Sequence, residues 1–182
     1  MIGGRGRRAR ILLDSIQAAG NQHSAIRMED SQRARLYETE LRVRYAETDQ
    51  MGVVYHSNYI VWFEVGRVEM LRELGFNYRE MEKQDGAHIA VVEARCRFKA
   101  PALYDDLITI RTRLLNVRDS LLHFGYEVVR SGDGTLLAEG ETVHLVVDKE
   151  FKRIRLPEKF LQPFLRAAGK DAPESSAALP TP

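Results

Sequence analysis

The sequence predicts an α+β domain in which an antiparallel sheet of five strands wraps around one long central helix. Two observations predict this class. A stretch from about residue 57 to 74 places apolar side chains around most of a helical circumference, and several other segments alternate apolar and polar residues as strands do. Because one helix follows the first strand and four strands follow the helix, we expect the curled sheet to enclose that helix.

The first strand is expected over residues 36 to 45, and the helix begins about twelve residues later. One face of this strand is formed by Tyr37, Thr39, Leu41, Val43 and Tyr45, which alternate with charged residues. The helix has a polar residue, Ser57 or Asn58, available to cap its start, and Gly75 lies just past its end. A helix that is apolar on so many sides should lie deep in the core, with Trp62 and Phe63 as core residues.

The remaining strands follow one another closely. Around residues 93 to 99, Ala94, Cys96 and Phe98 form one face, and Pro101 ends the strand. Two more strands are expected over residues 107–117 and 121–130, and a last one over about 135–147 after a Gly-Asp-Gly turn. We expect these strands to form an antiparallel meander.

Composition favours a single domain over residues 36–165. Residues 1–35 have no sustained apolar period, and the C-terminal residues are rich in Ala, Pro and Ser, so we expect a disordered N-terminal extension and a flexible tail over residues 166–182. Alternatively, the extension could be an organellar transit peptide, or translation could start at Met28. The apolar run of residues 11–13 is too short for a signal peptide or a membrane helix.

Charge and cysteine content limit the partners and the cellular compartment that we expect. The formal net charge of +1 gives no global attraction to nucleic acid or to an acidic membrane. The single cysteine, Cys96, cannot form an internal disulfide, which suits a reducing compartment, and we expect the cytoplasm. Because the three later histidines lie on separate strands without ligand spacing, we expect no metal and no cofactor. These are His88, His123 and His144.

Reactive residue types are densest in the segment from Tyr45 to Tyr59, between the first strand and the helix. Asp49 lies in this loop, and the helix that follows presents free N–H groups and the positive end of its dipole. Thioester hydrolysis needs both a carboxylate and N–H groups that stabilise the oxyanion. Asp49 would attack the carbonyl carbon or activate a water, while the backbone N–H of His56, or one just beyond it, would polarise the carbonyl oxygen.

The segment resembles the hotdog-fold acyl-CoA thioesterases of the 4-hydroxybenzoyl-CoA thioesterase family, and in particular their Tol-Pal-associated branch. The resemblance rests on a Y-x-x-x-D-x-x-G-x-x-x-H pattern followed by a tyrosine, and on a P-A-x-x-x-D segment. The matching residues are Tyr45, Asp49, Gly52, His56 and Tyr59, then Glu64 and Arg67, then Pro101, Ala102 and Asp106. It covers roughly residues 36 to 160 and implies a hotdog fold.

The resemblance implies a catalytic aspartate at Asp49, supported by Tyr45 and His56. Substrate contacts are expected from the flanking residues and from the hairpin at which the family binds the nucleotide of coenzyme A. These residues are Tyr55, Ser57, Asn58, Tyr59, Arg118 and Ser120. The resemblance also implies a homo-oligomer, a dimer or a homotetramer, with its sites at subunit interfaces. The expected substrate is an acyl-CoA, and we expect neither nucleic-acid binding nor membrane insertion.

Other readings remain open at this point. Asp49 could simply cap a turn, His56 could only begin the helix, and Tyr45 could be a buried strand aromatic. Arg95, Arg97 and Lys99, spaced along one strand face, could form a solvated surface or hold the phosphates of coenzyme A. The rival functions are a hotdog enoyl-CoA hydratase-like lyase and a non-enzymatic module that binds acyl-CoA or acyl-carrier protein.

Overall fold

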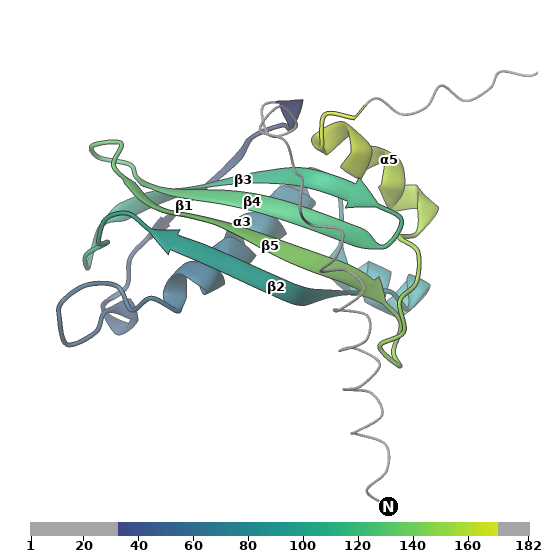
Figure 1. The fold of residues 1–182 in the computed structure, drawn as a ribbon, viewed down its shortest axis with the longest axis horizontal. Coiled ribbons are helices and arrows are strands. Elements are labelled where there is room, and N and C mark those ends of the chain that lie inside the picture. The colour runs from purple at the N-terminus through teal and green to yellow at the C-terminus, as the bar shows by residue number, and fades with distance from the viewer. Residues whose placement is uncertain (1–32, 171–182) are drawn as a thin grey trace, which may run out of the picture.

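The computed structural model describes residues 33–170 (Figure 1). The predictions for residues 1–32 and 171–182 concern residues outside this range. The elements in chain order are β1 (Tyr37–Arg42), the short helix η1 (Tyr45–Glu47), α3 (Asn58–Glu73), α4 (Tyr78–Glu80), η2 (Met81–Asp85), β2 (His88–Phe98), β3 (Leu107–Arg118), β4 (Leu121–Arg130), β5 (Leu136–Val147) and α5 (Glu158–Ala167). No helix in the described range is long and apolar enough to cross a membrane.

The strands form one antiparallel sheet in the order β1-β3-β4-β5-β2, which confirms the predicted class (Figure 1). The predicted meander of four consecutive strands is wrong in one respect, because β2 pairs with β5 and not with β3. Residues 99–106 carry the chain from β2 across to β3, and this connection includes Pro101. A tight hairpin needs only two to five residues, so a connection of this length can place the next strand elsewhere in the sheet.

Helix α3 packs on one face of the sheet, which we call the inner face (Figure 1). Phe63 stacks on Tyr126 of β4, with ring centroids 4.4 Å apart and an angle of 9° between the rings. Trp62 and Phe63 expose 1% and 0% of their surface, and burying one such side chain contributes roughly 1.5–3 kcal/mol. Gly66 permits the close approach, since an added Cβ there would lie 2.5 Å from the Thr112 hydroxyl oxygen.

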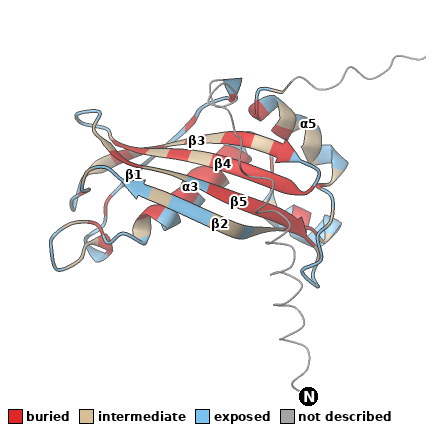
Figure 2. Ribbon diagram, viewed as in Figure 1, coloured by how far each residue is buried: buried red, intermediate tan, exposed pale blue. Residues whose placement is uncertain are grey.

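The helix was expected deep in the core because apolar residues cover most of its circumference, but it is buried on one side only. Ile60 and Val61 expose 37% and 47% of their surface, near the start of α3. The edge strand β2 is likewise open toward its C-terminal end, where Phe98 is 50% exposed (Figure 2). Gly75 follows the helix with φ +75°, a left-handed conformation that favours glycine and ends the helix as predicted.

Helix α5 was absent from the sequence-based expectations. Its N-cap is Pro157 and it contains Pro163, which weakens any helical pattern in the sequence. Phe164 is fully buried against Phe76, with ring centroids 5.5 Å apart, so α5 belongs to the main core. Tertiary packing therefore stabilises a segment whose local sequence signal is weak.

Candidate active site

The loop between η1 and α3 holds Asp49 in a tight turn. Thr48 and Val54 form an isolated antiparallel bridge, and the Asp49 amide donates to the Val53 carbonyl at 2.9 Å. Gly52 has φ +75° and donates back to the Asp49 carbonyl at 3.0 Å. This geometry fixes the backbone at Asp49 on both sides.

The Asp49 carboxylate has one occupied and one unoccupied oxygen. Oδ1 accepts from the Met51 amide at 2.8 Å, so the turn-capping interpretation is part of the structure. No hydrogen bond within residues 33–170 involves Oδ2. The capping bond therefore orients the carboxylate and still leaves one oxygen available to a substrate or a water.

The start of α3 offers two unpaired backbone donors. The Tyr55 amide donates to the Glu47 carbonyl at 2.8 Å, and the Asn58 amide donates to the Tyr55 carbonyl at 3.0 Å. In the described part of the chain no hydrogen bond uses the amides of His56 or Ser57. These N–H groups stand at the positive end of the helix dipole, where a developing negative charge is stabilised.

A hollow of about 710 Å³ adjoins the loop. It brings together four of the predicted site residues, Tyr45, Asp49, Tyr55 and Asn58. Tyr45 is 77% exposed and meets Tyr104 edge-on at 5.7 Å, so the alternative of a buried strand aromatic is wrong. Tyr45 is exposed because the chain leaves the sheet after Arg42 and turns into η1.

Three predicted residues lie beside this hollow without lining it. The His56 ring packs against Tyr55 at 4.3 Å and against Phe98 at 6.5 Å, and Ser57 is exposed at the helix N-cap. Tyr59 is buried, with its hydroxyl accepting from the Ala102 amide at 3.3 Å. The arrangement thus favours a structural role for Tyr59.

Arg118 and Ser120 lie at the opposite end of the sheet. The Asp49 loop follows Arg42, which pairs with the first residue of β3, whereas Arg118 is its last residue. At about 3.3 Å per residue the two ends are roughly 35 Å apart. Arg118 is exposed, and Ser120 is buried with its hydroxyl accepting from Arg153. One copy of the chain does not bring these residues to Asp49.

Glu47 was not predicted as a site residue, yet it connects the loop to the helix. Its side chain is 5% exposed and accepts from the Trp62 indole N–H at 3.2 Å and from the Arg44 amide and guanidinium at 2.8 Å each. Burial by itself raises the pKa of Glu47, but the bonds from Arg44 and Trp62 hold it below its ordinary value. A glutamate among charged loop residues carries no sequence signal of burial.

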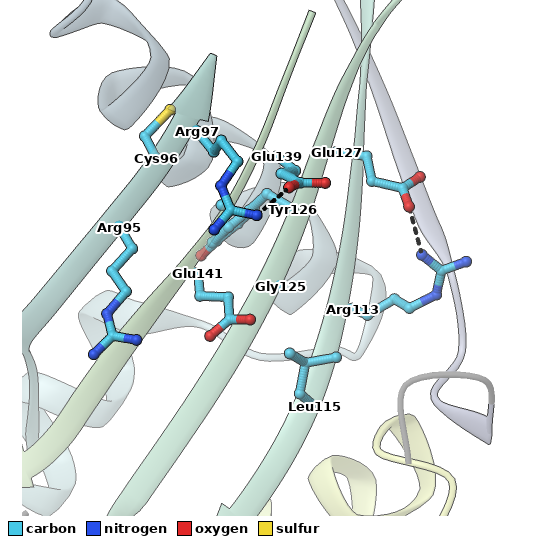
Figure 3. Close-up of a pocket in the computed structure, with 11 residues that line it drawn as sticks. Arg95, Cys96, Arg97, Arg113, Leu115, Gly125, Tyr126, Glu127, Glu139 and Glu141 are labelled. Atoms are coloured by element: carbon cyan, nitrogen blue, oxygen red, sulfur yellow. Dashed lines mark hydrogen bonds and ion pairs between the residues drawn. The ribbon is translucent and has the colours of Figure 1, made fainter. Parts of the chain in front are cut away.

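A second hollow, of about 390 Å³, lies on the outer face of the sheet, the face opposite α3 (Figure 3). Four of the charged residues that line it form ion pairs with each other: Arg97 with Glu139 at 3.2 Å and Arg113 with Glu127 at 3.9 Å. The residues that line it include none from the start of α3. The chemistry of ester or thioester cleavage therefore fits the hollow at Asp49.

No group of three or more His, Cys, Asp or Glu side chains within residues 33–170 is arranged to hold a metal ion. His144 is fully buried, and burial lowers its pKa to about 2, so its ring is neutral at physiological pH. Cys96 is half-buried, and burial raises its pKa to about 11, which disfavours a thiolate nucleophile.

The fold and the site define a class: an α+β domain whose antiparallel sheet packs on one long helix, with a carboxylate in the loop that precedes that helix. A family model described as the thioesterase-like superfamily matches residues 43–164. The putative acyl-CoA thioesterase YneP of Bacillus subtilis is 40% identical over 122 residues, which cover 66% of this chain and 87% of that protein. The acyl-CoA thioester hydrolase YbgC of Escherichia coli is 33% identical over 130 residues, covering 71% and 96%.

Among solved structures, the hypothetical protein TT1821 of Thermus thermophilus is 40% identical and superimposes with a TM-score of 0.68 over 73% of this chain and 98% of that one. The chain belongs to the thioesterase-like superfamily. The predicted hotdog fold and the predicted enzyme class, a thioester hydrolase, are confirmed.

Proposed function

We propose that this enzyme hydrolyses an acyl-CoA to a free acid and coenzyme A, with Asp49 as its central catalytic residue. The supporting observation is that Oδ2 of Asp49 and the amides of His56 and Ser57, which have no hydrogen-bond partner within residues 33–170, belong to one connected loop and helix start. The similarity to proteins named as acyl-CoA thioesterases supports the substrate class. Assignment to the Tol-Pal-associated branch and a cytoplasmic location are part of the same proposal.

The chemistry follows from these two groups. In the general-base version, Asp49 takes a proton from water, the hydroxide adds to the thioester carbonyl, and the amides of His56 and Ser57 stabilise the oxyanion. Collapse of this intermediate expels the thiolate of coenzyme A, which recovers the proton. In the nucleophilic version, Asp49 itself adds to the carbonyl carbon, the C–S bond breaks and expels the thiolate of coenzyme A, and water then hydrolyses the mixed anhydride to the free acid and the Asp49 carboxylate, releasing a proton that the thiolate takes up. Loss of one oxyanion donor typically costs about 100- to 1,000-fold in kcat.

The first test is release of thiol, followed with a chromogenic disulfide, from short, long and aromatic acyl-CoAs. Wild type should release thiol, and Asp49→Asn, which keeps the acceptor for the Met51 amide, should lose turnover with the fold intact. Gln50→Ala, beside it in the same hollow, is the matched control and should keep turnover. Retained activity in Asp49→Asn refutes the assignment, and hydration of crotonyl-CoA without thiol release supports the lyase.

Repeated turnover in ¹⁸O-labelled water distinguishes the two roles of Asp49. In the nucleophilic version, in which water attacks the Asp49 carbonyl of the anhydride, label enters the Asp49 carboxyl group. In the general-base version label appears only in the released acid. Mass spectrometry of the peptide that contains Asp49 reads the result.

We also propose that the enzyme is a homo-oligomer paired through β2. Among the described strands, β2 is an edge strand of 11 residues, and an edge of this length presents unpaired backbone groups. Val91 and Phe98 on this strand are each 50% exposed, and Ile60 and Val61 add exposed apolar surface from α3. Two copies joined along β2 would cover these groups and form a continuous sheet.

Antiparallel pairing of β2 also accounts for the predicted role of Arg118 and Ser120. Phe98, at the end of β2, contacts His56, so this end lies at the Asp49 side of the sheet. The β3–β4 hairpin lies at the other end, beside the start of β2. Because antiparallel partners run in opposite directions, the hairpin of one copy would lie at the Asp49 side of the other.

Light scattering at micromolar concentration should therefore give at least two chains per particle, and a monomer contradicts the proposal. Val91→Lys, which places a charge on the edge, should lower both the mass and kcat. Arg118→Ala should raise KM without changing the mass. An unchanged KM in Arg118→Ala removes this residue from the substrate site.

A further inference from the structure

Glu47 connects the loop that carries Asp49 to the first two turns of α3. Its backbone carbonyl accepts from the Tyr55 amide and from the Asn58 side-chain amide, both at 2.8 Å. Its carboxylate accepts from the indole of Trp62 at 3.2 Å. One residue thus receives hydrogen bonds from both sides of the Asp49 turn and from the helix.

The two donors from α3, Asn58 and Trp62, lie on the helix face that meets Glu47. Asn58 and Trp62 are four residues apart on α3, so their side chains project from the same face of the helix, one turn above the other. Asn58 contacts the carbonyl of Glu47 and Trp62 contacts its carboxylate. Two contacts one turn apart fix the direction of the helix axis at its start as well as its distance from the loop.

The paired and the unpaired amides follow one another along the chain. The Tyr55 amide donates to the Glu47 carbonyl, whereas the next two N–H groups, those of His56 and Ser57, have no acceptor among the described residues. Asp49 lies only two residues after Glu47, in a turn held by its own backbone bonds. A shift at Glu47 would therefore move the carboxylate relative to these amides.

We propose that Glu47 is a positioning residue for hydrolysis, which holds Asp49 and the amides of His56 and Ser57 in their reactive arrangement. This role rests on the proposed function. Misplacement of reacting groups by about 1 Å costs on the order of 100-fold in rate. Glu47 touches no reacting atom in this account, so its effect should fall on kcat and leave KM nearly unchanged.

The variant that tests this role most directly is Glu47→Gln, which keeps the shape of the side chain. The Glu47 carboxylate accepts from three donors, and an amide nitrogen in place of one of its oxygens would face a donor from Arg44 or Trp62. We expect kcat to fall about 10- to 100-fold with KM changed less than about threefold. Trp62→Phe removes the indole donor while keeping an aromatic ring, and kcat should fall in the same direction.

A double-variant cycle separates positioning from general loss of stability. If Glu47 and Trp62 act through one bond, the double variant should lose no more than about twofold beyond Glu47→Gln alone. The control is Leu114→Ala, a fully buried change on β3 that destabilises the core away from the loop. At a temperature where all variants are folded by circular dichroism, this control should keep kcat within about twofold of wild type.

The outcomes are distinguishable. Normal kcat in Glu47→Gln while wild type is active overturns the positioning role and leaves the proposed function standing. The role is also overturned if the losses of Glu47→Gln and Trp62→Phe multiply, or if Leu114→Ala loses as much activity. Absence of thiol release by wild type with every acyl-CoA overturns both proposals, since no reaction is then left to position.

Discussion

Replacing Gly66 with alanine tests how closely α3 must approach the sheet. An added Cβ would lie 2.5 Å from Thr112 Oγ1 and 2.7 Å from Ile110 Cγ2, whereas ordinary contact begins at 3.4 Å. The gap must therefore widen by about 0.9 Å. Neither neighbour can easily rotate away, because both are β-branched and stiff about χ1.

Two effects of opposite sign compete in this variant. Alanine gains about 1 kcal/mol over glycine in helix propensity. Overpacking a filled core costs about 1–3 kcal/mol, and here the clash involves two side chains of a central strand. We expect the clash to win and the free energy of unfolding to fall by about 1–2 kcal/mol. Since α3 also carries the amides at its start, a displacement near 0.9 Å should lower kcat about 10- to 100-fold.

Urea unfolding followed by circular dichroism, together with thiol release, measures both quantities. Gly132→Ala is the matched control, because a Cβ at that position of the β4–β5 turn meets no atom within 4 Å. It should change the free energy of unfolding by less than about 0.5 kcal/mol. A Gly66→Ala protein more stable than wild type by about 1 kcal/mol, with normal kcat, refutes the reasoning.

Three further predictions concern buried polar groups. Arg67 is 7% exposed, and within residues 33–170 it forms no ion pair and its Nε has no hydrogen-bond partner; its Nη1 donates to the Tyr126 hydroxyl at 3.4 Å. Because a buried charge without an ion pair is costly, Arg67→Met should leave the free energy of unfolding equal or raise it by about 1–3 kcal/mol. A clear loss of stability in urea unfolding contradicts this. The pKa of Glu47 is lowered on folding, so its stabilising effect is full above the ordinary value of 4.5 and is lost as pH falls through the folded value. The difference in free energy of unfolding between wild type and Glu47→Gln should therefore shrink in acid. A difference that stays constant with pH argues against a lowered pKa of Glu47 in the folded protein. With a pKa of about 11, Cys96 should react slowly with iodoacetamide at pH 8, and labelling as fast as free cysteine argues against its burial.

Much of the architecture could be predicted from local patterns. The strand alternation and the long apolar helix have distinct periods, and Gly75 ends the helix with a positive φ as expected. Asp49 could be proposed as catalytic from the sequence because a carboxylate in a loop before a helix start, and the motif around it, are visible there. Sequence periodicity could not show that β2 pairs with β5, because alternation identifies a strand and not its neighbour.

What the sequence by itself determined is the five strands, the one long helix, their order along the chain and the loop that joins a carboxylate to the start of that helix. These follow from side-chain periods and turn residues, which act within a few positions of one another. Only the tertiary structure decided that Glu47 is buried against Trp62 and that Arg118 lies at the far end of the sheet. Burial and distance depend on how whole elements pack, because residues far apart in the chain exclude water from each other only after the fold has formed.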